Sequence, residues 1–156
     1  MQAKPGVVER LNSILTSELT AVNQYFVQAE MIKNWGFENL YEKIRHLSLG
    51  EMKDAQEIIR YILFLEGVPN LQRLNDVEIG ESVEEDLRLN LGKELAIIEL
   101  MSETVTHCAS VGDFATRGMI EASIRDEQEH VDWLETQLET IRQIGIENYL
   151  SQQLHS

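Results

Sequence analysis

Residues 68–82 read VPNLQRLNDVEIGES, and they separate two pairs of long amphipathic segments. Segments 7–34 and 38–65 are joined by a short turn, and so are segments 83–111 and 113–144. A helix of about 28 residues is roughly 42 Å long, and fifteen extended residues reach roughly 50 Å. The stretch can therefore run the whole length of a bundle, so that the third helix runs parallel to the second.

Apolar residues recur every three or four positions in each long segment, which predicts amphipathic helices. Gly36, Gly67, Gly112 and Gly145 stand at the expected helix ends. The third segment has its own start signal, because Ser82 and Glu85 have the spacing of a capping box. In the first segment the predicted apolar face is made of Leu11, Leu15, Val22, Phe26 and Ala29.

A short segment, IENYLSQQL at residues 146–154, follows the fourth long helix. The chain has 156 residues, enough for one domain with a sizeable core, and it shows no internal repeat or low-complexity tract. We therefore expect residues 1–156 to form a single all-α domain. Its fold class is a four-helix bundle with one long crossover and a short fifth C-terminal helix.

Composition narrows the classes of function. The formal net charge of −14 argues against binding to nucleic acid or to an anionic membrane. The single cysteine, Cys108, excludes an internal disulfide and fits a reducing compartment. No stretch approaches the roughly 20 apolar residues that span a bilayer. The first residues, MQAKPGVVER, lack the apolar run of a signal peptide, so we expect a cytoplasmic protein.

Each long helix carries a glutamate near its middle, at a position where helical spacing places it on the apolar face. Stepping from Ile44 along the second helix gives Leu47, Glu51 and then either Asp54 or Ala55. The six polar residues that share these faces are Glu18, Glu51, Asp54, Glu94, Glu127 and His130. The four helices thus supply Glu, Glu-x-x-Asp, Glu and Glu-x-x-His.

A lone glutamate on an apolar face is more often a core residue with satisfied hydrogen bonds. Several buried carboxylates repel one another unless a cation neutralises them. Di-iron carboxylate bundles use one Glu from each of two helices and Glu-x-x-His from each of the other two. The pattern therefore favours a dinuclear site for Fe(II), Mn(II) or Zn(II). Tyr25 shares the face of Glu18, where hydrogen bonding to a ligand, a redox role and ordinary packing all remain open.

Several stretches resemble bacterioferritins along essentially the whole chain. They are NQYF at 23–26, KNWGF at 33–37, EMK at 51–53, ILFLEGVPNLQ at 62–72, HVDWLET at 130–136 and IENYL at 146–150. The resemblance implies a ferritin-like subunit. Twenty-four copies would form a hollow shell that oxidises Fe(II), stores the ferric mineral and binds haem b between two subunits.

The resemblance also implies roles for individual residues. Glu51 and Glu127 would be bridging ligands, and Glu18, Glu94 and His130 would be terminal ligands of the ferroxidase centre. The family has a histidine where this chain has Asp54. An aspartate oxygen can bind iron, but the side chain is shorter than histidine, and the extra negative charge should favour Fe(III).

Met52 lies about 100° around the second helix from Glu51. Leu49, Ile59 and Leu63 extend the same flank, which makes an apolar stripe typical of a dimer face. A methionine in such a stripe is usually a packing residue. In the family, the matching methionine of each subunit ligates the haem iron, so the resemblance implies that Met52 binds haem.

The leading hypothesis is an iron-storage subunit that oxidises Fe(II) with O2 or peroxide. It would act in a shell of one subunit type or in a mixed shell with a second bacterioferritin subunit, and a ferredoxin-type protein would supply electrons for iron release. The alternative is a haem-carrying structural subunit whose ferroxidase centre is impaired by Asp54. A metal-free bundle that binds a partner would require all six polar residues to coincide by chance.

Overall fold

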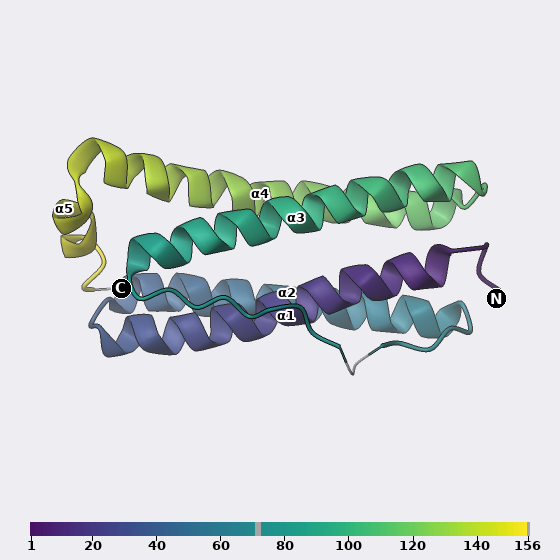
Figure 1. The fold of residues 1–156 in the computed structure, drawn as a ribbon, viewed down its shortest axis with the longest axis horizontal. Helices are drawn as coiled ribbons and strands as arrows, with labels where there is room; N and C mark the ends of the chain where they lie inside the picture. Colours follow the sequence, from purple (N-terminus) through teal and green to yellow (C-terminus); the bar gives the residue numbers. More distant parts are fainter. Residues whose placement is uncertain (71–72, 156) are drawn as a thin grey trace.

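The computed structural model describes residues 1–70 and 73–155, and within them it contains only helices and their connections. The long helices are α1 (Val7–Asn34), α2 (Glu38–Phe64), α3 (Val83–Ser110) and α4 (Phe114–Ile144). They lie alongside one another, and the short α5 (Ile146–Ser151) sits at one end of the bundle (Figure 1). The predicted all-α bundle with a fifth short helix is confirmed.

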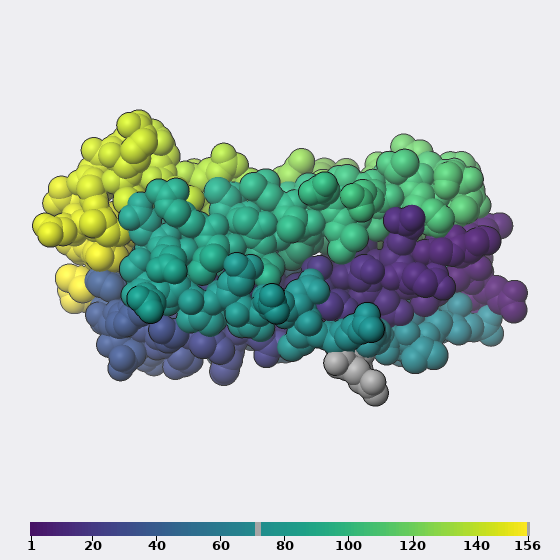
Figure 2. All heavy atoms as spheres, viewed as in Figure 1, coloured from purple at the N-terminus to yellow at the C-terminus, as the bar shows by residue number. Residues whose placement is uncertain are grey.

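The four helices form two hairpins. α1 packs along α2 and α3 packs along α4, while α1 and α3 join the two hairpins side by side. The crossover leaves the end of α2 and returns along the bundle to the opposite end, where α3 begins (Figure 1). Its described residues lie on the surface over α1 and α3 (Figure 2). α2 and α3 are therefore parallel, as the length of the crossover predicts.

The start of α3 follows its sequence signal closely. The side chain of Ser82 accepts a hydrogen bond from the backbone N–H of Glu85 at 3.2 Å. The Glu85 carboxylate accepts the backbone N–H of Glu81 at 3.2 Å. Ser82 thus satisfies a donor of the first helical turn, and Glu85 satisfies the N–H of the residue before the N-cap. The crossover consequently ends at Ser82, and Glu94 lies about three turns into the helix that begins after it.

The core is a continuous apolar cluster along the bundle axis, to which α1 contributes Leu11, Ile14 and Leu15. One predicted member is wrong. Phe26 is 59% exposed, because its neighbour Tyr25 takes the inward position and Phe26 is rotated about 100° away. Two adjacent isoleucines of α3 also differ in burial, since Ile97 is buried and Ile98 is only partly buried.

α5 closes one end of the bundle. Tyr149 is buried and donates a hydrogen bond from its hydroxyl to Oε1 of Gln137 at 2.8 Å. After α5, the backbone carbonyl of Gln153 accepts a hydrogen bond from the backbone N–H of Asn39 at 3.0 Å. Within the described ranges, no helix combines the length and apolarity needed to cross a membrane.

Candidate metal centre

Four of the six predicted ligands converge in the interior of the bundle. They are Glu51 on α2, Glu94 on α3, and Glu127 and His130 on α4. One ligand atom from each lies within 4.8 Å of the others, which no other group of three or more His, Cys, Asp and Glu side chains does in the described residues. We call these four residues the carboxylate–histidine cluster.

Helix geometry explains the convergence. Glu127 and His130 are three residues apart and therefore share one face of α4. Nδ1 of His130 lies 3.2 Å from Oε2 of Glu127, 3.4 Å from Oε1 of Glu51 and 3.6 Å from Oε1 of Glu94. The imidazole is thus surrounded by carboxylates from three helices. The three glutamates are at most 1% exposed, so bulk water does not screen them.

The cluster contains an unusual number of unpaired polar atoms. Both oxygens of Glu51, one oxygen each of Glu94 and Glu127, and Nδ1 of His130 are buried without a hydrogen-bond partner among the described residues. One oxygen of Glu18 shares this property. Buried polar groups are rarely left unpaired unless a water or an ion completes them. Hard oxygen donors with one imidazole suit Fe(II), Mn(II) or Zn(II), so the donor set fits a metal site.

In the absence of a cation, bound protons compensate part of the negative charge of the clustered carboxylates. Burial, and next the neighbouring Glu94, raise the pKa of Glu127 to about 11. Burial alone would lower the pKa of His130, but its contacts with Glu127, Glu51 and Glu94 raise it to about 12. At neutral pH, the metal-free cluster therefore holds protons on Glu127 and His130. These groups titrate as a unit rather than as independent sites.

The remaining carboxylates differ from one another. Burial raises the pKa of Glu51 to about 7. Burial would also raise the pKa of Glu94, but contacts with Glu127, His130 and Tyr25 lower it below its usual value. Burial and the charges of Glu51, Asp54 and Glu94 raise the pKa of Glu18 well above its usual value. Glu18 is therefore close enough to sense the cluster, although it is not one of the four convergent residues.

Of the three roles considered for Tyr25, the structure shows the hydrogen bond to one of the proposed ligands. Its side chain is fully buried on α1, and its hydroxyl donates a hydrogen bond to Oε1 of Glu94. This contact stabilises the ionised form of Glu94 and leaves the other oxygen of Glu94 free to bind a cation. Burial and the charges of Glu94 and Glu51 raise the pKa of Tyr25 well above its usual value, so the phenol remains a donor.

Asp54 occupies a different position from the cluster. Of the two residues that could follow Glu51 on the core face, Ala55 is 1% exposed, whereas Asp54 is only partly buried. Burial and the charges of Glu57 and Asp126 raise the pKa of Asp54 to about 6. Asp54 thus lies near further acidic residues, and it is not a member of the carboxylate–histidine cluster.

The predicted apolar stripe on α2 is largely exposed in the single chain. Met52 is 52% exposed, and Leu49 and Leu63 on the same helix are exposed to similar degrees, while Ile59 is partly buried. Phe26 adds exposed apolar surface on the neighbouring α1. Met52 therefore lies exposed on an apolar surface of the single chain.

Sequence reasoning missed three amides beside the site. Gln24, Gln28 and Asn90 are fully buried and are hydrogen-bonded to one another. Gln24 and Gln28 are one turn apart on α1, and Asn90 is one turn before Glu94 on α3. The sequence signal for these amides is their four-residue spacing: Gln24 and Gln28 are four residues apart, and Asn90 is four residues before Glu94.

Comparison with known proteins gives a consistent result. The model of the ferritin-like domain matches residues 8–144. The chain is 41% identical to a bacterioferritin of Mycolicibacterium paratuberculosis, with 97% of this chain and 96% of the relative covered. It is also 41% identical to a bacterioferritin of Rhodobacter capsulatus, over 96% of this chain and 92% of the relative. A bacterial ferritin of Pseudomonas aeruginosa is 38% identical over 99% of this chain and its own full length.

Proposed function

This chain belongs to the bacterioferritin family, and from that premise we propose that it is an iron-storage subunit with a ferroxidase centre inside its bundle. The observation that supports the centre most strongly is the convergence of ligand atoms from three helices in a buried position without hydrogen-bond partners. A purely structural polar layer would complete the hydrogen bonds of its buried atoms, whereas here His130 has only ion-pair contacts of 3.2–3.6 Å with the carboxylates. The unpaired set instead has the composition of a site for hard divalent cations.

The family resemblance gives each proposed ligand a role. Glu51 and Glu127 would hold the metal pair as bridging ligands. Glu94 and His130 would be terminal ligands, and Glu18 would be the terminal ligand from α1. Asp54 would be the sixth residue of the metal site, at its edge.

The bound metal pair would supply one-electron redox chemistry. The protein's own side chains bind Fe(II), balance its charge and exclude water. Each Fe(II) that becomes Fe(III) gives up one electron, and O2 or peroxide accepts the electrons together with protons. Buried carboxylates favour the more highly charged Fe(III), because opposite charges attract more strongly where water is excluded. Tyr25 orients Glu94 throughout by its hydrogen bond.

The oxidised iron would be stored as mineral in a hollow shell of 24 copies in the cytoplasm. Met52 would bind haem b together with the same residue of a second copy, because its thioether lies on an exposed apolar flank. A haem held by two such thioethers would supply electron transfer. A ferredoxin-type reductant would then supply electrons through the haem for iron release.

The position of Asp54 favours a second candidate function. Because Asp54 is not among the convergent ligands, one metal position would have fewer protein donors than the Glu-x-x-His pattern supplies. The chain would then be a haem-carrying structural subunit with weak ferroxidase activity. It would assemble into a mixed shell with a competent second subunit that has histidine at this position.

Aerobic oxidation of Fe(II) by the purified assembly, followed by ultraviolet absorbance, tests the ferroxidase proposal. Glu127→Ala removes a bridging ligand and should abolish rapid oxidation. Equilibrium binding of Co(II) to the same variant should also be lost. Glu135→Gln is the matched control, because Glu135 is an exposed acidic residue on the same helix. Unchanged metal binding in Glu127→Ala would contradict the assigned centre.

A further inference from the structure

Three buried amide side chains and one backbone unit of the crossover form a closed ring of hydrogen bonds. Gln24 donates to Oδ1 of Asn90 at 2.9 Å, and Asn90 donates to Oε1 of Gln28 at 2.8 Å. Gln28 then donates to the backbone carbonyl of Glu78 at 3.2 Å, and the backbone N–H of Glu78 donates to Oε1 of Gln24 at 3.0 Å. We call this arrangement the amide ring.

The direction of the ring is determined at every member. Each side-chain amide donates through its nitrogen to the next member and accepts at its oxygen from the previous one. Reversing one amide would place two acceptors or two donors against each other. Gln24, Gln28 and Asn90 have no exposed surface, so water does not replace a lost partner. The ring therefore requires a definite spacing of α1, α3 and the crossover, because buried unpaired amides are strongly unfavourable.

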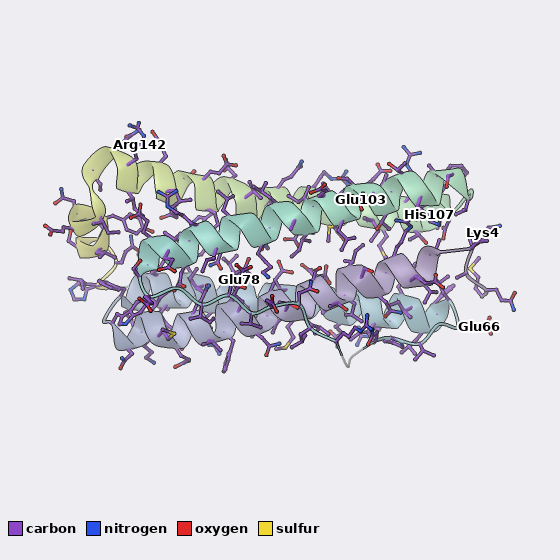
Figure 3. All side chains as sticks on the ribbon, viewed as in Figure 1. Lys4, Glu66, Glu78, Glu103, His107 and Arg142 are labelled. Carbon is purple, nitrogen blue, oxygen red and sulfur yellow. The ribbon has the colours of Figure 1, made fainter. Side chains whose placement is uncertain are left out.

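The crossover is held to the two helices by further bonds next to the ring. Lys93 on α3 donates to the carbonyl of Asp76 at 3.0 Å and lies 3.4 Å from the Glu78 carboxylate. The backbone N–H of Asn75 donates to the hydroxyl of Thr20 on α1 at 2.8 Å. Glu78 lies on the crossover between the ribbons of α3 and α1 (Figure 3). Residues 75–78 thus join two helices that belong to different hairpins.

The same two helices carry the hydrogen bond between Tyr25 and Glu94. Gln24 is the residue before Tyr25, and Asn90 is one helical turn before Glu94. A shift of α1 along α3 that disrupts the amide ring would also separate the Tyr25 hydroxyl from the Glu94 carboxylate. The amide ring and the hydrogen bond between Tyr25 and Glu94 therefore depend on the same spacing between α1 and α3.

We propose that Gln24, Gln28 and Asn90 are positioning residues that hold Tyr25 against Glu94 and thereby set the orientation of Glu94 as a metal ligand. This inference rests on the proposed metal-binding function. It adds that the crossover, besides connecting the hairpins, determines the geometry of one terminal ligand. Loss of the ring would leave the ligands present but would let the Glu94 carboxylate rotate away from the metal.

Co(II) binding to the assembled protein tests the proposal without relying on turnover. The visible absorption of bound Co(II) reports on the ligand geometry, and a titration gives the affinity. Asn90→Leu removes two ring bonds with little change in volume. We expect roughly tenfold weaker Co(II) binding, the lower end of what loss of a residue that orients a metal ligand causes, and a changed visible band.

A control separates positioning from general destabilisation. Ile62→Ala creates a cavity on α2, about three turns from Glu51, and lowers thermal stability through the core alone. It should leave the Co(II) affinity and spectrum unchanged. An equal effect of Ile62→Ala and Asn90→Leu on the spectrum would overturn the proposal. If Asn90→Leu does not fold, Gln28→Met breaks the ring from α1 and carries the same expectations.

The decisive readout is a double-mutant cycle with Tyr25→Phe. If the ring acts through the tyrosine, Asn90→Leu should weaken Co(II) binding in the native background and have little further effect in Tyr25→Phe. Additive effects would show that the ring does not act through Tyr25. Failure of the native protein to bind Co(II) would instead refute the proposed metal centre itself. Native Co(II) binding that Asn90→Leu leaves unchanged would refute only the positioning role.

Discussion

Glu127 and His130 lie one turn apart on α4, and Oε2 of Glu127 is 3.2 Å from Nδ1 of His130. Each holds a proton at neutral pH in the metal-free protein, because burial and neighbouring carboxylates raise the pKa of Glu127 to about 11 and the carboxylates raise that of His130 to about 12. A metal ion at the proposed centre would need the carboxylate and the neutral imidazole as ligands. Protons and metal would therefore compete for the same atoms.

Metal binding should release protons, and the affinity should increase with pH. Each displaced proton increases the apparent affinity by about tenfold per pH unit over the range in which it is bound. Calorimetric titration with Zn(II) in two buffers of different ionisation enthalpy measures the number of protons released. An affinity that is constant between pH 6 and pH 8 would show that the protonated cluster is not the binding site.

The metal-free protein should become less stable as pH rises through the range in which Glu51 titrates. Its pKa is about 7 when folded, against a usual value of 4.5, so the folded state holds a proton that the unfolded chain has lost. The pKa of His130 is raised as well, from 6.5 to about 12. Stability from both groups is therefore present at low pH and declines on going to pH 8.

Thermal unfolding in the presence of a chelator, followed by circular dichroism at pH 5.5 and pH 8, measures this trend. The midpoint should be lower at pH 8, and saturating Zn(II) should raise it most at the higher pH. A higher midpoint at pH 8 without metal would mean that folding does not raise the pKa values of Glu51 and His130.

Asp54→His should increase the rate of Fe(II) oxidation. Histidine is longer than aspartate, and its imidazole restores the Glu-x-x-His pattern on α2. We expect an increase on the order of tenfold, measured as initial aerobic oxidation rates. Glu42→His places the same side chain at an exposed position of α2 and should have no effect. A lower rate in Asp54→His would show that Asp54 is a working ligand in the native chain.

Met52→Leu should abolish six-coordinate haem binding while preserving the fold. Leucine keeps the volume of the exposed side chain but has no sulfur donor, and such exchanges usually change stability by less than about 1.5 kcal/mol. Reconstitution with haem, followed by its visible absorption, measures the effect. Met119→Leu on α4 is the control for loss of a methionine elsewhere. A native spectrum in Met52→Leu would exclude this residue as the axial ligand.

Helical spacing alone predicted which glutamates face the interior of the bundle. Glu51, Glu94 and Glu127 are buried and close together because each occupies a regular position in an apolar stripe. The crossover also followed from length, since about fifteen residues reach from one end of the bundle to the other. In these cases, local periodicity determines which way a side chain points, and the bundle then brings the stripes together.

Other features depend on packing between helices, which periodicity does not specify. Phe26 and Tyr25 are adjacent, and helical spacing allows either of them to face the core. In the structure Tyr25 faces the core, where its hydroxyl is hydrogen-bonded to Glu94. Asp54 and Ala55 presented the same ambiguity, and the smaller apolar residue took the buried position. The amide ring includes the backbone of Glu78, whose place against α1 has no side-chain signature.

Anomalous X-ray scattering from crystals of the native protein soaked anaerobically with Fe(II) would locate the proposed iron pair directly. We predict two neighbouring iron peaks in the bundle interior. They should be bounded by Glu51 and Glu127, with Glu18, Glu94 and His130 as terminal ligands. Ordered iron at other positions and none between these side chains would contradict the proposed centre.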